Sequence, residues 1–219
     1  MKLFGSYRRL AAWILALALS GGAAAQPVPG KDYELIRPAQ PTSSGAKVEV
    51  IEFFSYACPH CGTLQPRLHS WLKKKPADVE FRRAPVVFQD SWLPFAAAYH
   101  AFDAMGLVDK LHYEFFIAIH ERQTLEVKVL LRDQKPLFDW VAKQGVDRQK
   151  FVDVYNSFGV RSRTNRSIEL PGNYHVSSTP TLVVDGKYLT TPSMVGYERF
   201  FQVLDQVIAM ARKERAAKK

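Results

Sequence analysis

The sequence predicts an α/β fold, a mixed central sheet flanked by helices, with an all-helical domain inserted into it. Three observations support this class: residues 48–88 read as strand, helix and strand, residues 89–172 read almost entirely as helices, and strand character returns near residue 181. A strand, a helix and a strand in roughly 40 residues form a βαβ unit, whose two strands are parallel. The chain has 219 residues, 47% of them hydrophobic, which excludes a disordered or low-complexity protein.

Residues 1–25 have the features of a cleavable signal peptide. Three basic residues precede a short apolar run over residues 10–19, and the small residues 23–25 follow it. We expect cleavage between Ala25 and Gln26. The alternative is a membrane anchor, but an apolar run of about 10 residues is roughly half of what spans a bilayer. The mature chain is therefore expected to be exported, soluble and in a compartment that permits disulfides.

The remaining boundaries follow the changes in composition and periodicity along the chain. The predicted parts are an N-terminal segment over residues 26–45, the first part of the sheet domain over residues 46–88, the helical insertion over residues 89–172, the second part of the sheet domain over residues 173–211 and a basic tail over residues 212–219. The N-terminal segment is rich in Pro, Gly and Ser, and carries at most one short strand over residues 33–36.

The first part of the sheet domain carries two predicted strands and a helix. Residues 48–54 are β-branched and aromatic, which indicates a strand. Residues 58–72 carry leucine at every fourth position from Leu64, the spacing of an amphipathic helix. Residues 79–88 predict a second strand, interrupted at Pro85.

The insertion is predicted to be a series of short helices, over residues 95–105, 108–120, 136–143, 147–158 and 161–170. Gly159 is expected to end the fourth of them and Pro171 the fifth. We expect the insertion to cap the functional site and to offer an apolar docking surface through Phe95, Tyr99 and Phe102. The alternative is that these aromatic residues form the core of the helices.

The second part of the sheet domain begins with a predicted hairpin. Residues 181–184 and 187–189 are strands separated by Asp185-Gly186, a strong signal for a two-residue turn. From Tyr197 onwards the apolar residues lie on one face of a terminal helix.

The positive charge of the chain is concentrated at its ends. The formal net charge is +9, but the basic residues of the signal peptide and of the tail account for most of it and leave about +2 on the body. A nucleic-acid-binding protein usually carries its basic residues on the folded surface. The charge therefore gives no support to nucleic-acid binding.

The two cysteines of the chain form one C-x-x-C motif, Cys58-Pro59-His60-Cys61, at the predicted junction of a strand and a helix. Residues three apart at a helix start are neighbours and can form a disulfide. The unpaired N–H groups of the first turn stabilise a thiolate at Cys58 and lower its pKa. Pro59 suits the first helical turn, and the His60 side chain is expected to stabilise the sulfur further. Cys61, one turn deeper, is expected to be the buried resolving thiol.

A structural disulfide or a zinc site would account for the motif less well. A disulfide across four residues would constrain the unfolded chain very little. A zinc site would need two further ligands, and the other histidines form no H-x-x-H pair or second C-x-x-C. The sequence therefore predicts redox chemistry at Cys58 and Cys61, with no metal and no cofactor.

The region around the motif resembles the DsbA-type thiol:disulfide oxidoreductases, which have the thioredoxin fold and act in the bacterial periplasm. The resemblance rests on residues 53–61, on the long helical insertion and on Thr179-Pro180-Thr181 before the hairpin. It implies that Pro180 is cis and faces the cysteines, and that the backbone of Thr179 pairs with an extended substrate. It also implies reoxidation by a membrane quinone reductase of the DsbB type.

The same resemblance implies a buried acid six residues before the first cysteine, which is Glu52 here. This carboxyl group would lie beneath the disulfide and help to move the proton of Cys61; the alternative is an outward-facing glutamate. Three positions depart from the family pattern. Gln65 stands where a glutamate is often found, Arg83 stands for a lysine, and Thr179 replaces the valine of the enterobacterial type.

The predicted function is a thiol:disulfide oxidase that donates its disulfide to newly exported, reduced proteins through a mixed disulfide at Cys58. The alternatives are a disulfide reductase or isomerase of the same fold, and a non-catalytic peptide-binding chaperone. A monomer is expected, because the mature chain has no segment left for the dimerisation domain that an isomerase usually carries. The partners are expected to be unfolded secreted proteins and the membrane reductase.

Overall fold

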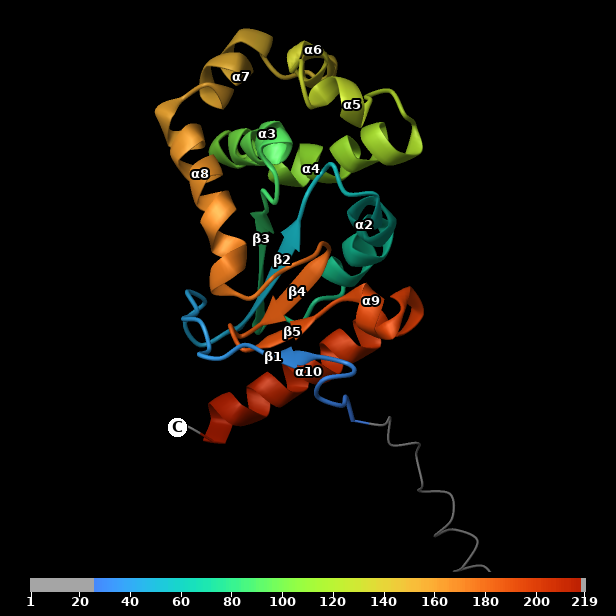
Figure 1. Cartoon of the computed structure of the whole chain (residues 1–219), viewed down its shortest axis with the longest axis vertical. Helices are drawn as coiled ribbons and strands as arrows, with labels where there is room; N and C mark the ends of the chain where they lie inside the picture. Colours follow the sequence, from blue (N-terminus) through green and yellow to red (C-terminus); the bar gives the residue numbers. More distant parts are fainter. Residues whose placement is uncertain (1–25, 218–219) are drawn as a thin grey trace, which may run out of the picture.

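The structure is a computed structural model that describes residues 26–217 of the chain (Figure 1). The predicted signal peptide, residues 1–25, lies outside the described residues. Among residues 26–217, no helix combines the length and the apolar character needed to cross a membrane.

The core of the fold is a mixed five-stranded sheet in the order β1-β5-β4-β2-β3, which confirms the predicted class. The central strand β2 (Val48–Phe54) is parallel to β3 (Val79–Pro85) and antiparallel to β4 (Thr181–Val184). Two short strands complete the sheet, β5 (Tyr188–Thr190) and β1 (Glu34–Leu35).

The two faces of the sheet bury different parts of β2, because alternate side chains of a strand point to opposite sides. Val48 and Val50 pack under helices α2 (Pro59–Leu72) and α10 (Tyr197–Ala217). Ile51 and Phe53 pack on the other face with Tyr174, just after helix α8 (Phe158–Asn173). Glu52 points to the same face as Val50, towards α2.

The helical insertion forms a cap above the ends of β2 and β3, with α8 leading back along the sheet domain (Figure 1). In chain order it contains the 3-10 turn η1 (Asp90–Trp92), α3 (Leu93–Ala104), α4 (Val108–Phe116), the π-helix η2 (Ile117–Glu121), α5 (Val127–Leu130), α6 (Lys135–Lys143), α7 (Arg148–Tyr155) and α8. The sequence did not predict α5, nor the four-residue helix α9 (Pro192–Val195) that precedes α10.

Two predicted helix ends are wrong. The helix expected over residues 147–158 ends at Tyr155, and α8 begins at Phe158 because the Ser157 side chain accepts the N–H of Val160. Gly159 is therefore inside a first helical turn. Pro171 does not end α8, which continues to Asn173.

Pro171 is tolerated inside α8 because the carbonyl of Ser167, which would accept its missing N–H, accepts another hydrogen bond instead. A proline lacks the N–H that would bond to the carbonyl four residues earlier, which is that of Ser167. The backbone N–H of Val87 donates to this carbonyl at 3.2 Å. Val87 is free to do so because the second strand ends at Pro85 instead of continuing to residue 88, another difference from the prediction.

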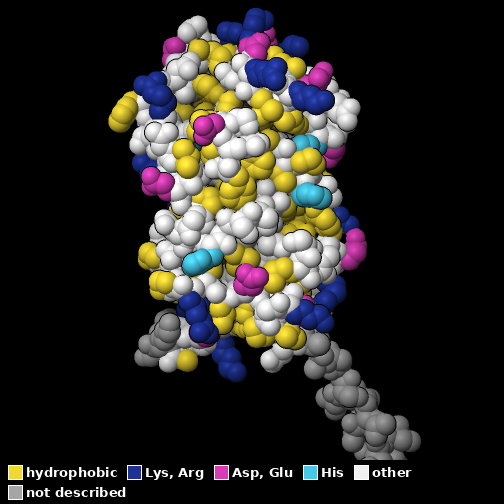
Figure 2. Space-filling model, viewed as in Figure 1, with side chains coloured by type: hydrophobic (Ala, Val, Ile, Leu, Met, Phe, Trp, Pro, Cys, Tyr) yellow, Lys and Arg dark blue, Asp and Glu magenta, His cyan; other side chains and the backbone are white. Residues whose placement is uncertain are grey.

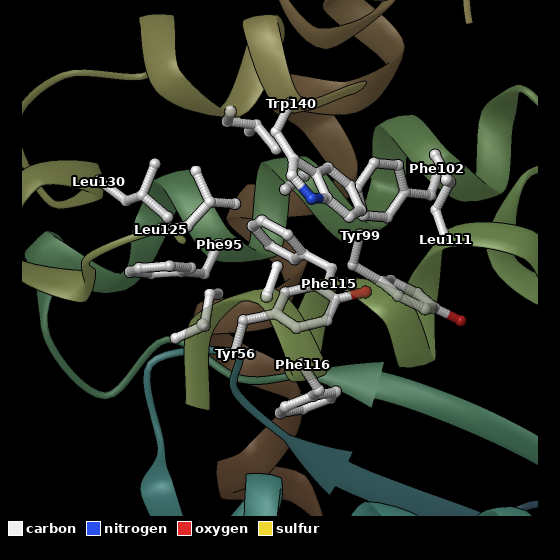
Figure 3. Close-up of a cluster of buried hydrophobic side chains, with 14 of the residues drawn as sticks. Tyr56, Phe95, Tyr99, Phe102, Leu111, Phe115, Phe116, Leu125, Leu130 and Trp140 are labelled. Carbon is white, nitrogen blue, oxygen red and sulfur yellow. The ribbon is translucent and has the colours of Figure 1, made fainter. Parts of the chain in front are cut away.

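The prediction of an apolar docking surface on the cap is also wrong. Phe95, Tyr99 and Phe102 are 2%, 8% and 0% exposed and form the core of the cap, which was the alternative (Figure 3). Tyr56, from the turn after β2, inserts into the same cluster. The core of the cap is thus continuous with the segment that precedes Cys58.

Residues 212–217 of the predicted tail form the last turns of α10, and two of their arginines bind the sheet domain. Arg212 binds both carboxylate oxygens of Asp78 at 2.6 and 2.8 Å, and Arg215 binds Asp185 at 2.9 Å. Two of the basic residues that produce the high net charge are therefore paired at the end of the last helix.

The hairpin between β4 and β5 has the predicted two-residue turn. Asp185 and Gly186 have φ of 55° and 65°, and the N–H of Lys187 donates to the carbonyl of Val184 at 3.0 Å. This is the geometry of a type I′ turn. A Cβ on Gly186 would lie 2.0 Å from the carbonyl oxygen of Gln40, so glycine is required for space as well as for backbone conformation.

We predict that Gly186→Ala lowers the free energy of unfolding by about 3 kcal/mol, through the positive φ and the contact with Gln40. Gly30→Ala is the matched control, because Gly30 has φ of 76° but nothing within 4 Å of its missing Cβ. It should cost only about 1 kcal/mol. Urea unfolding measures both, and equal losses would show that the contact with Gln40 adds nothing.

Candidate active site

Cys58 and Cys61 lie where β2 turns into α2. Cys58 is the N-cap residue of α2, Pro59 is its first residue, and the carbonyl of Cys58 accepts the N–H of Cys61 at 3.1 Å. Both cysteines are free thiols in this structure. Cys58 is 7% exposed and Cys61 is fully buried, so only Cys58 is open to a partner in solution.

The two thiols have pKa values shifted in opposite directions. A hydrogen bond from Cys61, more than offsetting burial, lowers the pKa of Cys58 to about 5, with further help from the Thr179 side chain and from the backbone N–H groups of Cys61 and His60. Burial raises the pKa of Cys61 well above its usual value, and the hydrogen bond to Cys58 raises it further. A low pKa suits a leaving group, and a buried thiol of high pKa suits a resolving group.

The backbone N–H of His60 helps to lower the pKa of Cys58, and the stabilisation of the sulfur by its imidazole stays a prediction. The side chain is exposed and lies beside Tyr197, the first residue of α10. The Tyr197 hydroxyl donates to the carbonyl of His60 at 3.2 Å and lies 3.5 Å from its Nδ1. The sequence did not single out Tyr197, because this contact joins residues 137 positions apart.

Thr179 and Pro180 lie next to Cys58. The peptide bond between them is cis, and the Cys58 thiol donates to the carbonyl of Thr179 at 3.4 Å. They reach this position because β4 begins at Thr181 and pairs with β2 at Phe53. The sheet register thus brings residues far apart in the sequence to the same point.

Glu52 is completely buried beneath the cysteines, so it is not an outward-facing glutamate. The Gln65 side chain of α2 donates to its Oε1 at 2.7 Å, and Nε of Arg83, its neighbour in the parallel register of β3, lies 3.4 Å from its Oε2. Burial raises the pKa of Glu52 to about 7, although Arg83 and Gln65 oppose the rise. Two of the positions that depart from the family pattern therefore meet at this carboxyl group.

Within residues 26–217, no three or more His, Cys, Asp and Glu side chains are grouped to hold a metal ion. The polar side chains beneath the cysteines are those of Glu52, Gln65 and Arg83. The arrangement is suited to thiol and proton transfer.

The comparisons with known proteins agree with this geometry. A family model described as thioredoxin matches residues 43–206. The chain is 42% identical over 189 residues to the thiol:disulfide interchange protein DsbA of Burkholderia cepacia, covering 84% of this chain and 87% of that protein. The crystal structure of the oxidoreductase DsbA from Xylella fastidiosa superposes with a TM-score of 0.79 at 32% identity, covering 86% of this chain and 100% of that one. The chain belongs to the DsbA family of thiol:disulfide oxidoreductases.

Membership of the DsbA family confirms the thioredoxin fold and the oxidoreductase activity that the sequence predicted, with an oxidase role in disulfide formation. The DsbA of Pseudomonas aeruginosa is a further relative, 36% identical over 210 residues and covering 94% of this chain and 96% of that protein. Its crystal structure superposes with a TM-score of 0.77 and covers 88% of this chain and 97% of that one.

The low pKa of Cys58 has a defined effect on the redox balance of this DsbA-family chain. With a folded pKa of about 5 and an unfolded value of about 8.5, the reduced form gains about 2.7 kcal/mol at pH 7. This corresponds to about 60 mV for a two-electron couple. The general principle that a low thiol pKa makes a DsbA disulfide more oxidising is known for the family, and in this chain the contacts described above lower the pKa of Cys58.

We predict that the reduced form is the more stable redox form at pH 7 and loses this advantage in acid. Because the folded pKa of Cys58 is depressed, the extra stability is full above the unfolded pKa and fades as pH falls through about 5. The difference in unfolding free energy between the reduced and oxidised forms should shrink by about 2.7 kcal/mol from pH 7 to pH 4. A difference that does not change with pH would contradict the thiolate mechanism.

We predict that Glu52→Gln has a more favourable effect on the free energy of unfolding, relative to the parent, at pH 8 than at pH 4. The folded pKa of Glu52 is raised to about 7, so its contribution to stability is full below the unfolded value and is lost as pH rises through 7. The neutral amide avoids this loss, and the gain over the parent should be up to about 3 kcal/mol larger at pH 8 than at pH 4. Glu80→Gln is the control, because the Glu80 side chain reaches solvent. Equal effects of Glu52→Gln at both pH values would refute the buried ionisation.

Proposed function

We propose that this chain oxidises newly exported, reduced proteins by passing on a disulfide between Cys58 and Cys61. The observation that carries the proposal is the pairing of a partly accessible thiol of low pKa with a fully buried thiol of high pKa, one helical turn apart. This asymmetry supports Cys58 as the sulfur that meets the substrate and Cys61 as the sulfur that leaves when the disulfide opens.

The first step is attack of a substrate thiolate on Cys58 in the Cys58–Cys61 disulfide. A bond forms between the substrate sulfur and Sγ of Cys58, the disulfide breaks, and its electron pair passes to Cys61, which takes up a proton. Glu52 is close enough to Cys61 to affect its pKa, and its own pKa of about 7 allows it to exchange a proton near neutral pH.

The second step releases the product. A second thiolate of the substrate attacks the substrate sulfur of the mixed disulfide, and Cys58 leaves as a thiolate. The substrate has then lost two electrons and gained a disulfide, and the enzyme holds the dithiol. The low pKa of Cys58 favours this step, because a thiol of lower pKa is the better leaving group.

Substrate binding is proposed at Thr179 and Pro180. An extended substrate chain that pairs with the backbone of Thr179 would place its cysteine next to Cys58, since the thiol lies 3.4 Å from the carbonyl of Thr179. Lys and Arg side chains gather towards the two ends of the face shown in Figure 2, and the band between them is mostly hydrophobic or uncharged. Such a band suits contact with unfolded chains.

The family and the sequence support a proposal for the cellular setting. We propose that residues 1–25 are removed on export and that the mature chain acts in the periplasm as a monomer without a cofactor of its own. A membrane quinone reductase of the DsbB type would reoxidise the dithiol. The pKa of Cys58 favours the oxidase over the reductase or isomerase alternative, because a thiol of ordinary pKa gives a less oxidising disulfide.

We predict that Cys58→Ala abolishes disulfide formation in a reduced, unfolded client protein. Cys61→Ala that carries glutathione in a mixed disulfide on Cys58 should exchange with a client that has a single thiol, release reduced glutathione and accumulate a mixed disulfide between Cys58 and the client. Without Cys58 no sulfur can receive the client thiolate, and without Cys61 the enzyme cannot resolve the bond from its own side. Free-thiol assays and non-reducing gels follow both outcomes. Persistent disulfide formation by Cys58→Ala would overturn the proposal in favour of the chaperone alternative.

A further inference from the structure

Two histidines of the cap hold Tyr56, which lies two residues before Cys58. The phenol oxygen of Tyr56 is 2.7 Å from Nδ1 of His112 in α4, and its backbone carbonyl oxygen is 2.8 Å from Nε2 of His120 in η2. Tyr56 and His112 are 0% and 2% exposed. The hydroxyl and the carbonyl of this one residue of the sheet domain are thus both bonded to the helical insertion.

Tyr56 is a central residue of the turn that leads to the active site. The N–H of Cys58 donates to the carbonyl of Ser55 at 3.1 Å, which closes a turn over residues 55–58, and the N–H of Ala57 donates to the Ser55 hydroxyl at 3.2 Å. In such a turn the two central residues set the direction of the chain. Fixing Tyr56 therefore fixes where Cys58 enters the first turn of α2.

The position of His120 depends on an irregular helix and on a glycine. η2 is a π-helix, closed by the N–H of Arg122 donating to the carbonyl of Ile117 at 2.8 Å, and π-turns are rare and frequent at functional sites. The His120 ring stacks on Phe116. It also lies against Gly62, where a Cβ would be 2.8 Å from its Cγ and Cδ2 atoms. The imidazole fits there because the residue after Cys61 has no side chain.

The carbonyl oxygen of Tyr56 can only accept, so Nε2 of His120 donates to it. Burial, with the charge of Arg83, holds the pKa of His112 well below its usual value, so this imidazole is neutral. Its Nδ1 shares a hydrogen bond with the Tyr56 hydroxyl, and the tautomer of His112 decides which of the two atoms is the donor. Tyr56 is thus hydrogen-bonded to both histidines.

We propose that His112 and His120 are positioning residues that hold the turn over residues 55–58, and that the helical insertion thereby sets the reactivity of Cys58. The inference rests on the proposed function, in which Cys58 is the reactive sulfur. The thiolate of Cys58 is stabilised by groups of the first turn of α2, including the backbone N–H groups of His60 and Cys61. Hydrogen bonds depend steeply on geometry, so a turn that moves relative to α2 weakens this stabilisation.

The test compares variants of the full chain by two readouts, the ultraviolet titration of the Cys58 thiolate and the equilibrium constant with glutathione. His120→Ala and Gly62→Ala should raise the pKa of Cys58 and make the disulfide about two- to tenfold less oxidising, the effect of one hydrogen bond. His120→Gln should restore most of the parent value, because a glutamine amide can donate to the same carbonyl.

His100→Ala is the matched control. His100 is another histidine of the cap, and its Nε2 lies 2.9 Å from the hydroxyl of Ser167 in α8. Its loss should lower stability in both redox forms and leave the glutathione equilibrium constant unchanged. Where His120→Ala does not fold, Tyr56→Phe removes only the hydroxyl bonded to His112 and should move both readouts in the same direction.

The proposal is overturned if His120→Ala, Gly62→Ala and Tyr56→Phe destabilise both redox forms equally while the Cys58 titration and the glutathione equilibrium stay at the parent values. The histidines would then have a structural role only. This failure is distinct from failure of the proposed function, which would appear as disulfide formation by Cys58→Ala and would leave the thiolate titrations of the other variants interpretable.

Discussion

The stabilisation of one thiolate at the start of α2 is the interaction on which the rest of the site depends. Cys58 is the N-cap residue of α2, and the hydrogen bond from Cys61 and the backbone N–H groups of the first turn lower the pKa of its thiol. The neighbouring elements determine the surroundings of Cys58. The turn that contains Cys58 follows β2, and the register of β4 on β2 places Thr179 next to it. The cap holds Tyr56 in the turn just before Cys58.

A second constraint lies below the cysteines, where an ionisable carboxyl group is buried in the sheet. Full burial of Glu52 would be costly without partners, and the structure supplies them from two elements, Gln65 on α2 and Arg83 on β3. Burial raises the pKa of Glu52 and these two partners lower it, which leaves it near 7. The pKa of Cys58 lies near 5. Groups whose environments separate their pKa values in this way can divide acid and base roles.

The sequence predicted the parts of this molecule that depend on local pattern. The strand over residues 48–54, the Asp185-Gly186 turn and the C-x-x-C motif at a helix start each follow from neighbouring residues. The contact of Thr179 and Pro180 with the cysteines was expected from the family resemblance, but other contacts between distant residues were not predicted. The continuation of α8 through Pro171 depends on Val87, and the anchoring of Tyr56 depends on histidines 56 and 64 positions away. Aromatic side chains such as Phe102 could not be assigned to core or surface until the helices were packed.

Local hydrogen bonds make Cys58 an unusually acidic thiol, and this acidity can be measured directly. The ultraviolet absorbance of the thiolate in the reduced protein, followed against pH with the oxidised protein as the blank, gives the pKa of Cys58. We expect a single transition near pH 5. A transition near the ordinary thiol value of about 8.5 would show that the contacts around Cys58 do not stabilise its thiolate.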